Sequence, residues 1–323
     1  MREADPLARR LLFVVGKGGV GRTTIAVATA LLAARRGARV LAVETDGAAA
    51  LGRALVVLRS QHHPPPGIER VRHLVIEGQA ALEEYLGLII PIRRVLRAVF
   101  ESGVYGAFVT AAPGLRELMT VGKIWYEVEG RAGEAEAPDF VVVDAPATGH
   151  GLQLLRMPQS AAEAFGAGLV RREAQRIVDL LRDDSRTAVL AVTTAEEMPV
   201  SETIEMLATL KRLQMPTPTV VLNQVHRSPC SEAELGVVQR AAQVASGASR
   251  MLLQTAAELA RTEARWAASG EHQAERLQEH IRGAIIRLPY LFSEEFGPIE
   301  QLKLTGALGD VLCPPPADVA RPL

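Results

Sequence analysis

Residues 11–24 read Leu-Leu-Phe-Val-Val-Gly-Lys-Gly-Gly-Val-Gly-Arg-Thr-Thr, an apolar run followed by a glycine-rich turn. The run Leu11–Val15 is typical of a buried β-strand, and the Ala/Leu-rich stretch Thr24–Arg36 is typical of a helix that ends at Gly37. Glycines between a strand and a helix let backbone N–H groups converge on phosphate oxygens, and the helix N-terminus favours an anion. A glycine-rich turn without a ligand is the plainer alternative, but the spacing, the flanks and the threonine pair all favour a P-loop.

The P-loop pattern assigns nucleotide-binding roles to a continuous stretch. Its residues are Gly16, Lys17, Gly18, Gly19, Val20, Gly21, Arg22, Thr23 and Thr24. We expect the Thr23 hydroxyl to reach Mg²⁺ and Thr24 to contact a phosphate nearer the ribose. Arg22 stands where the consensus has lysine, and its planar guanidinium is larger than an ammonium group. We therefore expect nucleotide binding to survive and the hydrolysis rate to depend on this exchange.

The rest of the chain alternates apolar runs with helical patterns, which predicts an α/β fold with a doubly wound, mainly parallel sheet. Strands are expected at 11–15, 39–44, 71–76, 140–144, 188–193, 219–223 and 284–288. Residues 201–213 carry apolar side chains at helical spacing. The stretch 231–282 is rich in helix formers, with turn signals near 246–249 and 269–270.

One stretch interrupts this alternation and predicts a helical insertion at about 77–137 within a single P-loop ATPase domain spanning 1–313. Helices are expected at 80–86, 92–101 and 115–127, and the insertion is a candidate lid or partner-binding subdomain. Its apolar and aromatic side chains between Val99 and Tyr126 form either its own core or an exposed hydrophobic groove. The tail 314–323 is Pro-rich and is expected to be flexible.

Composition excludes several classes of function. The net charge is −1 with no basic stripe, which argues against nucleic-acid binding. No apolar run approaches the roughly 18–20 residues that cross a bilayer, so we expect no stable membrane insertion. The two cysteines, Cys230 and Cys313, form no CxxC motif and are expected to be ordinary reduced thiols of a cytoplasmic protein.

Two aspartates follow predicted strands at the sheet edge where the P-loop lies. Asp46 either orients a water towards the γ-phosphate or caps the helix that begins near Gly47–Ala50, and the sequence leaves both roles open. Asp144 ends a buried strand and fits a Walker B role, holding Mg²⁺ through water. Residues 148–150 then open a short helix, 152–156, which we expect Pro158 to stop. This loop is a candidate sensor of the γ-phosphate.

Several motifs carry a family resemblance. GKGGVGRTT, residues 16–24, resembles the deviant Walker A motif of the SIMIBI class of P-loop ATPases. DAPATGHGLQLLRMP, residues 144–158, resembles the switch II segment of the arsenite-pump and tail-anchored-protein-targeting (ArsA-like) ATPases. Residues 45–50, TDGAAA, stand where that family has TDPAHS, so the aspartate matches but the proline and histidine do not. Residues 192–203 and 288–292 are also similar to family segments, and the matches extend from Gly16 to Phe292.

The resemblance implies ATP or ADP with Mg²⁺ as ligands and a dimer that sandwiches its nucleotides. It implies that Lys17 acts on the nucleotide of the opposite subunit and that Asp46 positions the attacking water. It also implies that Asn223 contacts the adenine while Pro289 lines the other side of the base. The residues themselves favour adenine, because His226 replaces the aspartate of the guanine-binding NKxD motif. A strand-end asparagine that caps a turn is the alternative for Asn223.

Three hypotheses follow for function. The first is a dimeric ATPase that couples hydrolysis to a conformational cycle of the helical subdomain. The second is a catalytically weak ATP-binding regulatory subunit of a heterodimer. The third is a partition or septum-positioning ATPase, which needs a basic surface or a membrane-binding helix that this sequence does not offer.

The client of such an ATPase is not defined by the sequence. Arsenite binding in the family uses three cysteines, and this chain has two. The zinc-binding CxxC and the long Met-rich insert of targeting members are absent as well. We expect a homodimer or a heterodimer with a paralogue, with the helical subdomain as the candidate site for a protein client.

Overall fold

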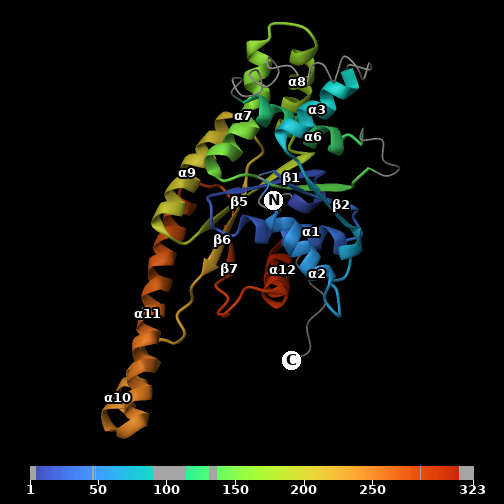
Figure 1. Cartoon of the computed structure of the whole chain (residues 1–323). Coiled ribbons are helices and arrows are strands. Elements are labelled where there is room, and N and C mark those ends of the chain that lie inside the picture. Colours follow the sequence, from blue (N-terminus) through green and yellow to red (C-terminus); the bar gives the residue numbers. More distant parts are fainter. Residues whose placement is uncertain are drawn as a thin grey trace, which may run out of the picture.

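The computed structural model describes residues 5–45, 47, 49–89, 114–130, 137–283 and 285–312. Within them lies one seven-stranded sheet with the order β3-β2-β4-β1-β5-β6-β7, in which every neighbouring pair of strands is parallel (Figure 1). The strands are β1 Leu11–Gly16, β2 Val40–Glu44, β3 Val71–Val75, β4 Phe140–Asp144, β5 Thr187–Thr194, β6 Thr219–Val225 and β7 Ile285–Pro289. All seven predicted strands are therefore confirmed, together with the α/β P-loop fold.

Helices cover both faces of the sheet because successive strand residues point to opposite sides. Leu12 and Val14 of β1 pack in one apolar cluster with the helices α1 Arg22–Arg35, α2 Ala50–Arg59 and α12 Pro298–Leu312. Leu11 and Phe13 belong to a second cluster on the other face. The helices on that side are α6 Leu115–Val128, α7 Thr148–Ala164, α8 Leu169–Arg182, α9 Glu197–Arg212 and α11 Gly247–Gln278. The sheet is thus doubly wound and apolar on both faces.

Four of the described elements remain. They are η1 Pro6–Ala8, η2 Ile68–Arg70, α3 Gly78–Ile89 and α10 Glu232–Val244. Helices α3, α6, α7 and α8 lie together on one side of the sheet, whereas α10 and the far half of α11 extend away from the sheet (Figure 1). Among the described helices, each is too short or too polar to cross a bilayer.

Two expected helix breaks are wrong. Helix α7 continues through Pro158 to Ala164, because its packing against α6, α8 and α9 outweighs the main-chain hydrogen bond that proline removes. Helix α11 continues through Gly270, where a Cβ would lie 3.1 Å from the Ala195 Cβ. This glycine lets the helix approach the end of β5 instead of ending the helix.

Several predictions lie outside the described residues. They concern the helix at 92–101, most of the loop at 130–138, the tail at 314–323 and Asp46. In the described part of the expected insertion, α3 and α6 are helical and pack against each other. The boundaries of the insertion and of the 1–313 domain stay predictions.

Candidate nucleotide-binding site

The glycine-rich turn lies at the carboxyl edge of the sheet, where β1 runs between β4 and β5. In open α/β sheets, ligands bind at this edge, where the strand order reverses. A Cβ on Gly16 would stand 2.3 Å from the Val192 carbonyl oxygen, so only glycine lets the turn leave β1 beside β5. Gly21 has φ +92° and lies against Asn223, whose Nδ2 would be 2.4 Å from an added Cβ. The turn is thus shaped by its neighbours.

Helix α1 begins directly after this turn and presents an uncapped N-terminus. Its N-cap residue, Gly21, offers no side-chain hydrogen bond to the first turn of the helix. First-turn N–H groups have no intrahelical partner, and the helix dipole favours negative charge at this end. The local structure therefore suits an anion such as a phosphate group.

Thr23 and Asp144, the two residues expected to hold Mg²⁺, lie in direct contact. The Thr23 Oγ1 donates to Asp144 Oδ2 at 2.6 Å, and Asp144 is 6% exposed at the end of β4. The Thr45 hydroxyl donates to the Asp144 carbonyl oxygen at 3.0 Å, which ties the end of β2 to the same residue. A hydroxyl and a carboxylate at the mouth of a phosphate site are hard oxygen donors of the kind Mg²⁺ prefers. This donor set fits the metal that the resemblance implies.

Arg22 contacts main-chain oxygens on both sides of the site. Its Nε donates to the Lys17 carbonyl oxygen at 3.3 Å, and its Nη1 donates to the carbonyl oxygen of Ala145. Ala145 directly follows Asp144, so the guanidinium connects the P-loop with the start of the predicted switch II. In this conformation two of its N–H donors are engaged by the protein itself.

Lys17 forms an ion pair that the sequence did not predict. Its Nζ lies 2.6 Å from Glu202 Oε1 on α9, and the two side chains are 34% and 33% exposed. Glu202 falls within the segment 192–203 that resembles the family, but nothing in its spacing indicated a contact with Lys17. The lysine expected to act on a second subunit is therefore held within its own chain here.

Asn223 has a different local role from the turn cap considered above. Strand β6 continues to Val225, and the buried Asn223 side chain donates from Nδ2 to the Val20 carbonyl oxygen at 2.9 Å. Pro289 ends β7 and lines a cavity of about 320 Å³ together with His226. His226 stacks on Tyr290 with ring centroids 4.5 Å apart. The expected contacts of Asn223 and Pro289 with adenine stay predictions.

The turn after β2 is described on both sides of Asp46. Ala49 occupies the N-cap position of α2 with φ +53° and makes no side-chain cap. Glu44, a residue that sequence reasoning passed over as part of a strand, accepts hydrogen bonds from the first turn of α2 instead. Ala49, and not Asp46, therefore occupies the N-cap position of α2.

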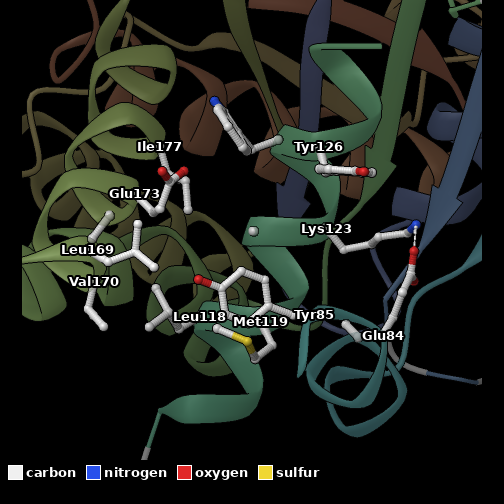
Figure 2. A pocket seen from close by; sticks show the side chains of 14 residues that line it. Glu84, Tyr85, Leu118, Met119, Lys123, Tyr126, Leu169, Val170, Glu173 and Ile177 are labelled. Carbon is white, nitrogen blue, oxygen red and sulfur yellow. Dashed lines mark hydrogen bonds and ion pairs between the residues drawn. The ribbon is translucent and has the colours of Figure 1, made fainter. Parts of the chain in front are cut away.

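A separate apolar cavity of about 340 Å³ lies between α3, α6 and α8 (Figure 2). Leu118, Met119 and Tyr126 of α6 line it opposite Leu169 and Val170 of α8. Ile124 is fully buried in the core instead. Of the apolar side chains expected to form a core or a groove in the insertion, the described ones therefore lie partly in the core and partly in the wall of this cavity.

Charged and phenolic side chains also line this cavity. Lys123 bonds Glu84 at 2.7 Å, as Figure 2 shows, and pairs with Glu127 at 3.0 Å. Burial lowers the pKa of Lys123, but the hydrogen bonds and charges of these two carboxylates outweigh it and raise the pKa overall. Burial, helped by the Glu173 charge, raises the pKa of Tyr85. Lys123 is thus paired with two carboxylates, and most of the other side chains that line the cavity are apolar.

Helix α7 connects the two sites. It begins at Thr148, close after Asp144, and packs against both α6 and α8, two walls of the apolar cavity. A smaller cavity of about 240 Å³ lies between Thr45, Pro146, His150 and the α6 residue Arg116. The ends of β2 and β4 therefore border directly on the helices of the subdomain.

Comparison with known sequences identifies the family. The profile of the anion-transporting ATPase family matches residues 9–172 and 168–245, most of the chain. The chain belongs to the anion-transporting ATPase family. The matched region contains the P-loop, Asp144 and Asn223, whereas Pro289 lies outside it.

Individual relatives agree with this assignment. ATPase BagA of Mycobacterium tuberculosis is 35% identical over 222 residues, which cover 67% of this chain and 65% of BagA. The arsenical pump-driving ATPase of Acidiphilium multivorum is 28% identical over 246 residues, covering 69% of this chain and 40% of that protein. An arsenical pump-driving ATPase of Escherichia coli is 28% identical over 240 residues, covering 66% and 39%. The matches thus span less than two thirds of each relative's length.

Proposed function

We propose that this member of the anion-transporting ATPase family binds and hydrolyses Mg²⁺-ATP. The observation that carries the proposal is the 2.6 Å pairing of Thr23 with Asp144 beside the uncapped N-terminus of α1. The N-terminus of α1 recognises phosphate, and the Thr23–Asp144 pair supplies oxygen donors for the metal that accompanies the phosphate. A glycine-rich turn without a ligand has no need of this combination.

The proposed roles of the residues follow the family motifs that they match. Thr23 and, through water, Asp144 hold Mg²⁺, which when bound neutralises phosphate charge. The amides of the turn and of α1 bind the β-phosphate, and Arg22 and Lys17 add positive charge near the transferred group. Asp46 orients the attacking water. Thr45, fixed to the Asp144 carbonyl, keeps the end of β2 beside the metal site.

Hydrolysis by the purified chain tests this proposal directly. Asp46→Asn is expected to abolish turnover while it leaves the affinity for a fluorescent ATP analogue unchanged. Asp184→Asn is the matched control, because Asp184 is exposed just before β5, at the sheet edge opposite the P-loop. A folded wild-type chain that ignores ATP with Mg²⁺ in calorimetry refutes the proposal.

We further propose that the active form is a dimer in which Lys17 acts on the nucleotide of the opposite subunit. Lys17 must then leave Glu202, and an ion pair whose side chains are about one third exposed is weak enough to exchange. Lys17→Ala and Asp46→Asn are each expected to be inactive as pure proteins. If Lys17 acts in trans, mixing them restores activity, because one site of a mixed dimer holds an intact Asp46 and faces an intact Lys17. No recovery after mixing, with dimers verified by light scattering, refutes the trans role.

A second candidate function is that of a catalytically weak regulatory subunit, paired with a paralogue. The observation in its favour is Arg22, whose guanidinium bonds the carbonyl oxygens of Lys17 and Ala145. Donors engaged in this way are withdrawn from the phosphates. Under this hypothesis wild type binds ATP without turnover and Arg22→Lys gains it. Turnover by wild type that Asp46→Asn abolishes excludes the regulatory role.

We propose that the nucleotide state is transmitted to a protein client through α7. This helix starts beside the predicted switch II and packs against two walls of the apolar cavity. Hydrogen exchange compared between ATP-analogue and ADP states is expected to differ in peptides covering 148–164 and 115–128. Asp46→Asn trapped with ATP should show the ATP pattern. Identical exchange in both states refutes the coupling.

A further inference from the structure

Glu44 is a buried carboxylate beside the catalytic turn. It is 1% exposed at the end of β2. Its Oε1 accepts from the Ala50 N–H at 2.6 Å, and its Oε2 accepts from the Gly52 N–H at 3.3 Å. His73 of β3 contacts the same Oε2 through Nε2 at 3.2 Å. Burying a carboxylate costs free energy unless such partners are present, and these three contacts offset that cost for Glu44.

The surroundings are shaped to keep this carboxylate in place. Ala49 at the N-cap position brings no side-chain acceptor, so Glu44 supplies the negative charge that the α2 N-terminus favours. An added Cβ on Gly52 would lie 2.5 Å from His73 Cε1, so glycine makes room for the imidazole. The side chain of Glu44 in β2 therefore contacts both helix α2 and strand β3.

The backbone of Glu44 is fixed on both sides as well. Glu44 lies opposite Asp144 in the register of β2 with β4, and its carbonyl oxygen accepts from the Ile76 N–H at 2.9 Å. The following residue, Thr45, bonds the Asp144 carbonyl. One residue thus links the metal-site strand, the β3–α3 connection and the start of α2.

The turn between Glu44 and Ala50 has left-handed backbone at two of its described positions. It contains no proline, and Gly47 and Ala49 both have left-handed φ angles, +68° and +53°. Alanine in that region is strained and is maintained by its surroundings. The hydrogen bonds that the Ala50 and Gly52 N–H groups donate to Glu44 join the two ends of this turn.

We infer that Glu44 is a positioning residue for hydrolysis, with His73 as its support: it fixes both ends of the turn that carries Asp46 relative to Asp144. The inference rests on the proposed ATPase function. A positioning role lowers kcat and leaves the KM for ATP unchanged, because Glu44 lies outside the phosphate-binding turn. A purely structural role lowers stability and leaves the kcat of the folded protein unchanged.

The test compares Glu44→Gln with Ser231→Ala. Glutamine keeps the size of the side chain but sets an amide group against the Gly52 N–H. Ser231 caps α10 in a capping box distant from the sheet, so its alanine variant loses a helix cap of the same kind without touching the turn. We expect Glu44→Gln to lower kcat about tenfold with KM within about twofold, a change of roughly 1.4 kcal/mol in the barrier. Amide exchange in nucleotide-free protein should rise in peptides covering 45–53. Ser231→Ala should leave both kcat and the amide exchange at 45–53 unchanged.

A pair of His73 variants keeps the inference testable if Glu44→Gln does not fold. His73→Gln retains an N–H donor for Glu44 and should keep most of the wild-type kcat, whereas His73→Leu should lower it several-fold. Equal kcat values for wild type and Glu44→Gln, or for the two His73 variants, overturn the inference, as does a fall in kcat without faster exchange at 45–53. Wild-type protein that binds ATP but does not turn it over sinks the proposed function, and this inference with it. Turnover that Glu44→Gln leaves intact sinks the inference alone.

Discussion

The contact between Gly21 and Asn223 gives a prediction that separates backbone strain from steric conflict. In Gly21→Ala, alanine must adopt φ near +92°, which costs about 1–2 kcal/mol. Its Cβ would also lie 2.4 Å from Asn223 Nδ2, so the carboxamide must move. Displacing it breaks the 2.9 Å bond to the buried Val20 carbonyl, at a further cost of about 1–3 kcal/mol. We expect Gly21→Ala to lower the free energy of unfolding by roughly 2–5 kcal/mol.

The double variant is the decisive measurement. Asn223→Ala alone loses the same hydrogen bond and leaves a small void, for about 2–4 kcal/mol. In Gly21→Ala/Asn223→Ala the steric conflict is gone and the hydrogen bond is lost only once. The double variant should therefore be about 1–3 kcal/mol more stable than the sum of the single changes predicts. Urea unfolding of the four proteins measures this coupling, with Gly37→Ala as the control: φ there is +92°, yet nothing lies within 4 Å of an added Cβ.

Additivity within about 0.5 kcal/mol refutes the reasoning, because it means that Asn223 does not restrain the turn. A strong coupling between Gly37→Ala and Asn223→Ala refutes it equally. Since Gly37 shares the left-handed backbone but not the contact, that result assigns the coupling to a global effect.

Three further predictions rest on other contacts. Arg22→Lys should raise the rate of single-turnover hydrolysis by roughly 10–100-fold, because the ammonium group no longer bonds the Ala145 carbonyl oxygen and can contact the phosphates instead. Quenched-flow assays measure this rate, and an unchanged or slower rate contradicts the prediction. Gly122→Ala should raise the free energy of unfolding by about 0.5–1 kcal/mol, since Gly122 lies inside α6 and its Cβ would approach Ile177 no closer than 3.9 Å; a lower melting temperature counts against open space there. Hydrogen bonds from the Arg39 side chain and backbone lower the pKa of Asp139 from 3.8 to about 2, so the stabilisation is present above pH 3.8 and is lost as the pH falls towards 2. Because these side chains are 43% and 48% exposed, Arg39→Gln should cost less than about 1 kcal/mol at pH 6, and the difference from wild type should shrink near pH 3.

The fold could be predicted because its signals are local. Each strand is a short, continuous apolar run, and such runs are typical of strands buried on both faces. Parallel strands also place their carboxyl ends at one edge, which is why Thr23 and Asp144 meet although they are 121 residues apart. The family resemblance stated from the P-loop and switch II motifs was confirmed by the family match.

The details that sequence reasoning missed depend on tertiary packing. Glu44 lies in an apolar run that is typical of a strand. Its carboxylate finds hydrogen-bond partners only in the folded protein, where α2 and His73 pack against it. The pairing of Lys17 with Glu202 joins residues 185 positions apart and follows no periodicity. Pro158 is a strong local stop signal, but contacts on several sides of α7 override it.

The contacts around Gly16 and Val20 have a consequence for the energetics of ligand capture. A loop of six residues, Gly16–Gly21, would lose on the order of 6–12 kcal/mol of backbone entropy if it became ordered only on meeting its nucleotide. Here the buried Asn223 side chain donates a hydrogen bond to the Val20 carbonyl oxygen of that loop, so part of this entropy is lost during folding. Preorganisation of this kind leaves more of the intrinsic binding energy available to move other parts of the protein. Weakening the restraint should therefore slow the conformational response to ATP before it destroys the fold.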